Sequence, residues 1–173
     1  MIRINTLQKA RTIRRLNSDD ISTVLQLCEG NPMYYRYCPP APSREGIEAD
    51  MRITPPGITA EDKYYLGIFE NQSLVAVLDL IDGYPEPDTA YLGFFMTDSR
   101  YQRNGLGTQI ICELLEGLRS NGFRFAKLGY ITENPQASHF WKKNGFIEES
   151  LGKSLNVAAD ITRAVLDLEN IRE

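Results

Sequence analysis

The sequence predicts one mixed α/β (α+β) domain, in which a mostly antiparallel sheet of six to seven strands is flanked by about four helices. Three β-rich runs follow one another closely in the middle of the chain, as in an antiparallel meander. A helix with a clear apolar stripe and a further strand come next, which makes a strand-helix-strand unit. No repeat or linker divides residues 1–173, and 42% hydrophobic with 24% charged residues is ordinary globular composition.

The first third of the chain predicts a strand, a helix, a loop and a second helix. Polar residues 17–20 supply cap side chains before the first helix, which Gly30 ends, and Ser43 caps the second helix ahead of Pro55. The aromatic and proline-rich stretch between the helices predicts a loop. The expected ranges are 11–16 for the strand, 21–30 for the first helix, 31–43 for the loop and 43–53 for the second helix.

The rest of the chain alternates between strands and helices. Two β-rich runs flank a tight turn at 70–73 and predict a hairpin, and a third run follows the turn-rich segment 82–88. The last helix begins after Asn134 as its cap and ends at Gly145. The expected ranges are 63–69, 74–81, 89–97, 123–131 and 160–169 for strands, with one more strand from near Phe146, and 107–120 and 134–146 for helices.

Charge and composition exclude several classes of partner. A net charge of −4 and a pI near 5.2 argue against nucleic acid, whose phosphates need a basic face. A single histidine and three separated cysteines favour neither a metal site nor a disulfide framework. No run reaches the roughly 20 apolar residues of a membrane span, and residues 1–15 lack the apolar centre of a secretory signal. We therefore expect a cytoplasmic protein without a metal or membrane partner.

The turn before the helix of 107–120 carries the clearest chemical signal. A strand, a glycine-containing turn and a helix together present unpaired N–H groups to an anion such as a phosphate. The dinucleotide pattern G-x-G-x-x-G fails because residue 110 is Ile110, and the lysine of a Walker A loop is missing. Taken alone, a short motif of this kind is more often only a tight turn, as in an interaction module without a ligand.

Two motifs together resemble the GCN5-related N-acetyltransferases (GNAT). The acetyl-CoA loop of that family, Q/R-x-x-G-x-G/A, matches Gln102, Arg103, Asn104, Gly105, Leu106 and Gly107. A second family motif matches Asn134, Ala137, Phe140, Trp141, Gly145 and Phe146 at the expected distance. The order of the predicted elements is similar over nearly the whole chain.

The resemblance implies a sheet splayed between its fourth and fifth strands and acetyl-CoA as the acyl donor. The CoA pyrophosphate would lie on N–H groups of Arg103 to Thr108, and the pantetheine arm would pair with the end of the fourth strand. Backbone N–H groups of Met96 and Thr97 would stabilise the oxyanion. The full set of cofactor-binding residues that the resemblance implies is Phe95, Met96, Thr97, Gln102, Arg103, Asn104, Gly105, Leu106, Gly107, Thr108, Asn134, Phe140 and Trp141.

The catalytic residues depart from the family pattern. Many members carry a tyrosine that protonates the departing thiolate, and here that position is Trp141, which either replaces it or packs beside CoA. Water, Tyr130 or another group would then supply the proton, or the thiolate would leave unprotonated. Asp79 shares a strand face with Val75 and Val77, so burial could raise its pKa and suit it to be the general base. Weaker candidates for the catalytic site are Asp98, Glu133 and His139.

The expected acceptor is a small-molecule or peptide amine. The resemblance places its pocket between the first two helices and the loop after the third strand, and aromatic rings there suit an ammonium group. The candidate residues are Tyr34, Tyr35, Tyr84 and Tyr130, with Met33, Tyr37, Glu86 and Asp88 near them. A CoA-binding sensor or inactive relative is the alternative to an enzyme, and the family resemblance also implies a homodimer.

Overall fold

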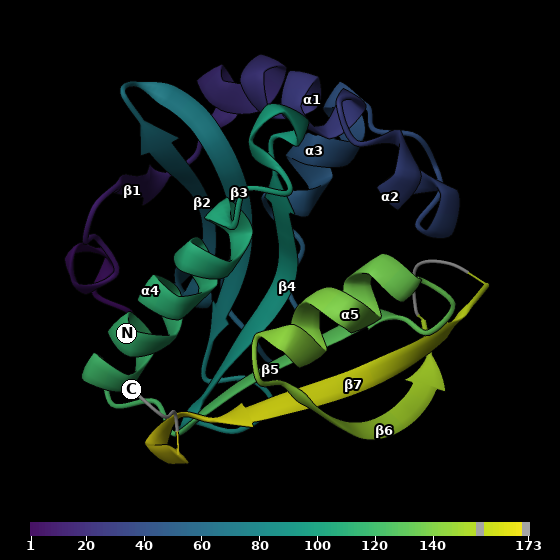
Figure 1. Cartoon of the computed structure of the whole chain (residues 1–173). Helices are drawn as coiled ribbons and strands as arrows, with labels where there is room; N and C mark the ends of the chain where they lie inside the picture. The colour runs from purple at the N-terminus through teal and green to yellow at the C-terminus, as the bar shows by residue number, and fades with distance from the viewer. Residues whose placement is uncertain (155–157, 171–173) are drawn as a thin grey trace.

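The computed structural model describes residues 1–154 and 158–170, and these residues form a seven-stranded sheet with five α-helices (Figure 1). The strand order is β1-β2-β3-β4-β5-β7-β6. The strands are β1 Thr12–Arg15, β2 Lys63–Glu70, β3 Ser73–Asp82, β4 Thr89–Thr97, β5 Phe125–Ile131, β6 Ile147–Lys153 and β7 Asp160–Asp167. The α-helices are α1 Ile21–Glu29, α2 Pro32–Tyr37, α3 Arg44–Asp50, α4 Leu106–Ser120 and α5 Pro135–Lys143.

The predicted strands and four of the helices are confirmed, but the predicted loop over 31–43 is wrong in part. This segment contains α2, which begins at Pro32 and ends before Pro39. Proline is tolerated at the first position of a helix because the N–H that it lacks would have no intrahelical acceptor there. The aromatic residues that follow can therefore continue one short helix.

All but one of the strand pairs are antiparallel. The hairpin of β2 and β3 turns through Asn71 and Gln72, whose φ angles of 48° and 66° suit a two-residue hairpin turn. The exception is β4 with β5, which pair in parallel with α4 as the crossover. The predicted strand-helix-strand unit is therefore present.

The parallel pair is short, because only Thr89–Leu92 of β4 pairs with Phe125–Leu128 of β5. Beyond Leu92 the two strands separate, with β4 rising towards α1 and α3 while β5 runs behind α5 (Figure 1). The separation starts at Gly93, where the register between β3 and β4 shifts by one residue. The splay between the fourth and fifth strands is thus confirmed, and a β-bulge lies at its start.

The core has two parts, because side chains of a strand alternate between the faces of the sheet. One part packs Leu78 and Leu80 of β3 with the apolar stripe of α4 and with Trp141 of α5. The other part packs Val77 of β3 and Met96 of β4 with α1 and α3. The open ends of β4 and β5 consequently have α4 and α5 on one side and α1 to α3 on the other.

Gly117 allows the N-terminal turn Ile4–Thr6 to pack closely on α4. A Cβ atom at Gly117 would lie 2.9 Å from the carbonyl oxygen of Thr6 and 2.7 Å from a methyl group of Leu7. We expect Gly117→Ala to lower the free energy of unfolding, because overpacking costs about 1 to 3 kcal/mol and exceeds the gain in helix propensity of about 1 kcal/mol.

Thermal unfolding measures this effect, with Cys112→Ala as the control on an exposed position of the same helix. The control should stay within about 0.5 kcal/mol of the wild type. A Gly117→Ala protein as stable as the control would contradict the predicted close packing.

Candidate active site

The turn before α4 leaves the start of the helix open to a ligand. Gly105 is the N-cap residue, with φ of 87°, and it has no side chain that could cap the helix. Asn104 Oδ1 accepts the N–H of Leu106 at 3.2 Å. The N–H groups of Gly107 and Thr108 belong to the first turn, where a helix provides no acceptor. An anion placed there would meet these donors and the positive end of the helix dipole.

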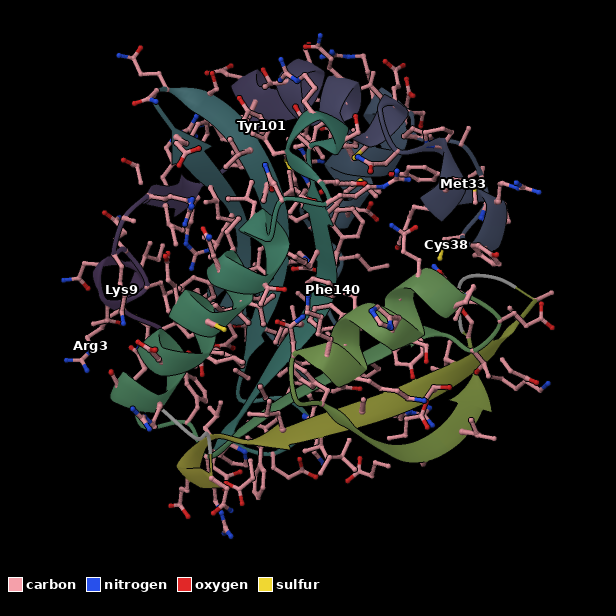
Figure 2. The ribbon with its side chains drawn as sticks, in the orientation of Figure 1. Arg3, Lys9, Met33, Cys38, Tyr101 and Phe140 are labelled. Carbon is pink, nitrogen blue, oxygen red and sulfur yellow. The ribbon has the colours of Figure 1, made fainter. Side chains whose placement is uncertain are left out.

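Gly107 brings this turn against α5 and the end of β4. A Cβ atom at Gly107 would lie 3.2 Å from the ring of Phe140 and 3.6 Å from the methyl group of Thr97. Figure 2 shows Phe140 between α4 and α5. The motif residues Gly107 and Phe140, far apart in sequence, are therefore neighbours at the open end of the splay.

The backbone at the end of β4 offers donors to this space. Asp98 donates its N–H to the carbonyl oxygen of Val75 on β3 at 2.9 Å. Because N–H groups alternate in direction along a strand, the N–H of Met96 also points towards β3, whereas those of Phe95 and Thr97 point towards the splay. For the predicted oxyanion donors, the geometry therefore favours Thr97, together with Phe95, over Met96.

The side chain of Gln102 fixes the turn rather than reaching into the splay. Its Nε2 donates to Asn31 Oδ1 at 2.6 Å and to the carbonyl oxygen of Thr97 at 3.1 Å. Asn31 Nδ2 donates in turn to Thr97 and to the carbonyl oxygen of Leu27. This network ties the ends of α1 and β4 to the loop. Of the other predicted loop residues, Arg103 and Asn104 are exposed.

Asn134 and Trp141 organise α5. Asn134 Oδ1 accepts the N–H groups of Gln136 and Ala137, both at 3.1 Å, so the predicted cap is confirmed. Trp141 is buried, and its ring contacts those of Phe140, Phe146 and Phe95 at centroid distances of 4.9, 5.2 and 6.1 Å. These contacts fit the interpretation of Trp141 as a packing residue beside the splay.

Tyr130 lies apart from the other predicted acceptor residues. Its hydroxyl donates to Glu148 Oε1 at 2.7 Å, and its ring packs in the same part of the core as Trp141. Burial, together with the neighbouring Glu148 carboxylate, raises the pKa of Tyr130. A hydroxyl held in this way is poorly placed to donate a proton across the splay or to hold an acceptor.

The other predicted tyrosines form two groups. Tyr34 packs edge-on against Tyr35 and against Phe94 of β4, at centroid distances of 5.1 and 5.6 Å. Tyr84 instead packs against Tyr91 at 5.4 Å. A pocket of about 380 Å³ opens beside Tyr35, and it is lined by Cys28, Glu29, Pro32, Tyr35, Arg36, Ala41 and Pro42. Figure 2 shows Met33 and Cys38 on the α2 side of the molecule.

Asp79 forms a buried ion pair with Lys63, which the sequence analysis did not single out. Lys63 Nζ lies 2.8 Å from both carboxylate oxygens, and the lysine side chain is only 3% exposed. Burial raises the pKa of Asp79, the Lys63 ammonium opposes that rise, and Asp50 adds to it. The raised pKa that we expected for this carboxyl group is thus present.

The weaker candidates do not share this environment. Hydrogen bonds from the side chain and N–H of Arg100 hold the pKa of Asp98 below its ordinary value. Glu133 and His139 are both exposed. Of the carboxylates that the sequence singled out, Asp79 is therefore the one whose raised pKa suits it to take a proton.

Metal-binding clusters and membrane-spanning helices are both missing from the described residues. Across 1–154 and 158–170, no three His, Cys, Asp or Glu side chains gather closely enough to hold a metal ion. Within the same ranges, no helix is long and apolar enough to cross a bilayer.

Comparison with known proteins places these features in one family. The profile described as the Acetyltransferase (GNAT) family matches residues 30–146. A search of curated protein sequences gives no significant match.

Solved structures of similar fold include the following three. An acetyltransferase from Thermus thermophilus is 22% identical and has a TM-score of 0.73, with 92% of this chain and 97% of that chain covered. A spermidine N-acetyltransferase from Vibrio cholerae in complex with CoA and spermine is 19% identical, with a TM-score of 0.70 and 94% and 98% covered. The PaiA N-acetyltransferase from Thermoplasma acidophilum in complex with coenzyme A is 17% identical, with a TM-score of 0.62 and 90% and 98% covered.

The cap at Asn134 can be tested by substitution. We expect Asn134→Ala to lower the free energy of unfolding by about 1 kcal/mol, because two N–H groups at the start of α5 lose their acceptor. Asn134→Asp keeps an acceptor and should unfold near the wild-type temperature. Thermal unfolding distinguishes the two variants, and equal losses in both would show that the cap contributes little.

Proposed function

We propose, since this chain belongs to the acetyltransferase (GNAT) family, that it transfers an acetyl group from acetyl-CoA to a primary amine by direct attack in a ternary complex. The observation that carries the proposal is the open first turn of α4, which faces the splay between β4 and β5. A diphosphate needs donors without acceptors, and an extended acyl arm needs unpaired strand backbone. The first turn of α4 contains Gly107, and the end of β4 reaches the same place, since the Thr97 methyl group would lie 3.6 Å from a Cβ atom at Gly107.

In this proposal each part of acetyl-CoA has its own partners in the chain. The pyrophosphate accepts N–H groups of the turn and of the first residues of α4, with the exposed Arg103 as a charge partner. The pantetheine arm runs along the open edge of β4 and packs on the ring of Phe140. Phe95 and Phe140 already stack at 5.9 Å, which gives the arm an apolar wall.

Asp79 takes the proton from the acceptor ammonium, and the amine then attacks the thioester carbonyl. The N–H groups of Phe95 and Thr97 stabilise the resulting oxyanion. Because Tyr130 is held by Glu148, collapse of the intermediate breaks the C–S bond without a proton from Tyr130. The second proton of the attacking nitrogen passes to the departing thiolate through water, or to solvent while CoA leaves as the thiolate. A thiol of pKa near 8.5 tolerates this departure near neutral pH.

The acceptor approaches from the side of α1 to α3. Tyr34, Tyr35 and Phe94 provide aromatic rings there, and Asp79 lies opposite Phe94 in the register of β3 with β4. An ammonium group beside these rings gains cation-π attraction. The proposed acceptor is therefore an amine on a small molecule or peptide.

The single domain, the homodimer and the cytoplasmic location stay predictions.

A CoA-binding protein without transferase activity is the second candidate. The packing of Trp141 among three phenylalanine rings, at a position where many members of the family carry an acidic tyrosine, favours it. It would bind acetyl-CoA and release no thiol with any amine.

Binding of acetyl-CoA is the first test, measured by thermal unfolding with and without the ligand. At a hundred times its dissociation constant, acetyl-CoA should add about 2.7 kcal/mol to the stability of the wild type. Gly105→Asp should abolish this gain, because a carboxylate at the N-cap repels the pyrophosphate, while the positive φ costs some stability that the control variant shares.

Gly57→Asp is the matched control. Gly57 has φ of 83° and Gly105 has φ of 87°, and in both cases a Cβ atom would meet no atom within 4 Å. Both substitutions thus place a side chain on a backbone with positive φ and open space around it, and only one lies at α4. Equal acetyl-CoA stabilisation in both variants would contradict the proposed pyrophosphate site.

Asp79→Asn tests the general base once a screen for thiol release has identified an accepted amine. We expect kcat/KM to fall about 100-fold at neutral pH, and less at high pH, where the amine is already deprotonated. The amide can still accept a hydrogen bond from Lys63, so we expect the fold to persist. The unfolding temperature of the variant checks this. An unchanged pH profile would exclude Asp79 as the base.

A further inference from the structure

We propose that Lys63 and Gly93 are positioning residues for Asp79, with Lys63 holding the carboxylate from β2 and Gly93 keeping it open to the acceptor from β4. This inference rests on the proposed function, in which Asp79 accepts a proton. Strand β3 lies between β2 and β4, so the two residues reach Asp79 from its two neighbouring strands.

Lys63 restrains both carboxylate oxygens at once. Its ammonium is 2.8 Å from each of them. In the register of the hairpin, Asp79 lies opposite Tyr65, and Lys63 lies two residues before Tyr65 on β2. A lysine that is 3% exposed has little freedom to leave this position. The carboxylate is therefore held in one orientation before an acceptor arrives.

Gly93 removes the side chain that would cover Asp79. A Cβ atom at Gly93 would lie 2.7 Å from Asp79 Oδ2 and 3.3 Å from its Cγ. The φ angle of Gly93 is outside the left-handed region, so the backbone does not itself demand glycine. Because Lys63 fixes the carboxylate, the clash could not be relieved by a simple rotation of Asp79. Gly93 is exposed, which leaves the carboxylate a path to solvent.

Among the described residues, Lys63 and Asp50 act on Asp79, and Asp79 acts in turn on Tyr65 and Tyr91. Lys63 and Tyr65 lie on β2, Asp50 lies at the end of α3, and Tyr91 lies on β4. Burial raises the pKa of Asp79, Asp50 raises it further, and the Lys63 ammonium lowers it. Removal of the ammonium should therefore move the pKa of Asp79 to higher pH.

A carbon-13 NMR titration of the Asp79 carboxyl group tests the contribution of Lys63 without any substrate. Relative to the wild type, Lys63→Met should move the midpoint upward by about one pH unit or more, and Lys63→Arg should leave it nearly in place. Lys63→Gln, which keeps a donor and loses the charge, serves if the methionine variant does not fold. A midpoint that is the same in the wild type and the uncharged variants would overturn the proposal.

A double-mutant cycle of thermal unfolding tests the contribution of Gly93. Gly93→Ala should lower the unfolding temperature of the wild type clearly, and far less in the Asp79→Ala background, where the clashing carboxylate is gone. Additive effects of the two substitutions would show that Gly93 serves another purpose and would overturn its assigned role.

The pH dependence of kcat/KM for the accepted amine connects these effects to catalysis. In the uncharged Lys63 variants, the acidic limb of the pH profile should move together with the NMR midpoint. Gly93→Ala should lower kcat/KM for the amine and leave KM for acetyl-CoA unchanged. A limb that stays in place while the midpoint moves would overturn this inference and leave the transferase proposal intact. Binding of acetyl-CoA without transfer to any amine would instead overturn the proposed function.

Discussion

Gly93 adds one residue to β4 opposite β3, between the pairs Leu80–Leu92 and Asp79–Phe94. A bulge of this kind increases the local twist, and the parallel pairing with β5 ends at the residue before it. The N–H groups of Phe95 and Thr97 consequently have no neighbouring strand. The first turn of α4 and the ring of Phe140 lie at the same opening. One inserted residue thus determines where strand backbone, helix N-terminus and aromatic wall meet.

The buried ion pair of Lys63 and Asp79 is not explained by its contribution to stability alone. Desolvation of two buried charges offsets much of their attraction, and apolar residues of similar size often serve a fold equally well. The remaining shift of the Asp79 pKa is upward despite the lysine, so the carboxylate stays easier to protonate than an exposed one. Local conflicts of this kind are expected at functional sites, where a fold gives up stability for chemistry.

The sequence predicted the elements whose signals are local. The β-branched runs, the apolar stripe of α4 and the caps at Ser43 and Asn134 each act within a few residues. Helix α2 was missed because the prolines of 31–43 were taken as breakers, although Pro32 occupies the one turn that tolerates it. Lys63 and Gly93 were missed because their roles depend on strand register. Nothing local to either residue indicates that both lie against Asp79.

The three glycines around the site show why motif patterns find only part of it. Gly105 is required by its backbone, since its φ of 87° disfavours other residues. Gly107 is favoured by the ring of Phe140, which a Cβ atom would approach to 3.2 Å. Gly93 is favoured by a carboxylate on the next strand. The first two stand two residues apart in one recognisable turn, so a pattern of spacing detects them. The third has the same physical cause as Gly107, close approach of a side chain, but its partner comes from pairing between strands. Such a residue becomes visible only when the register of the sheet is known.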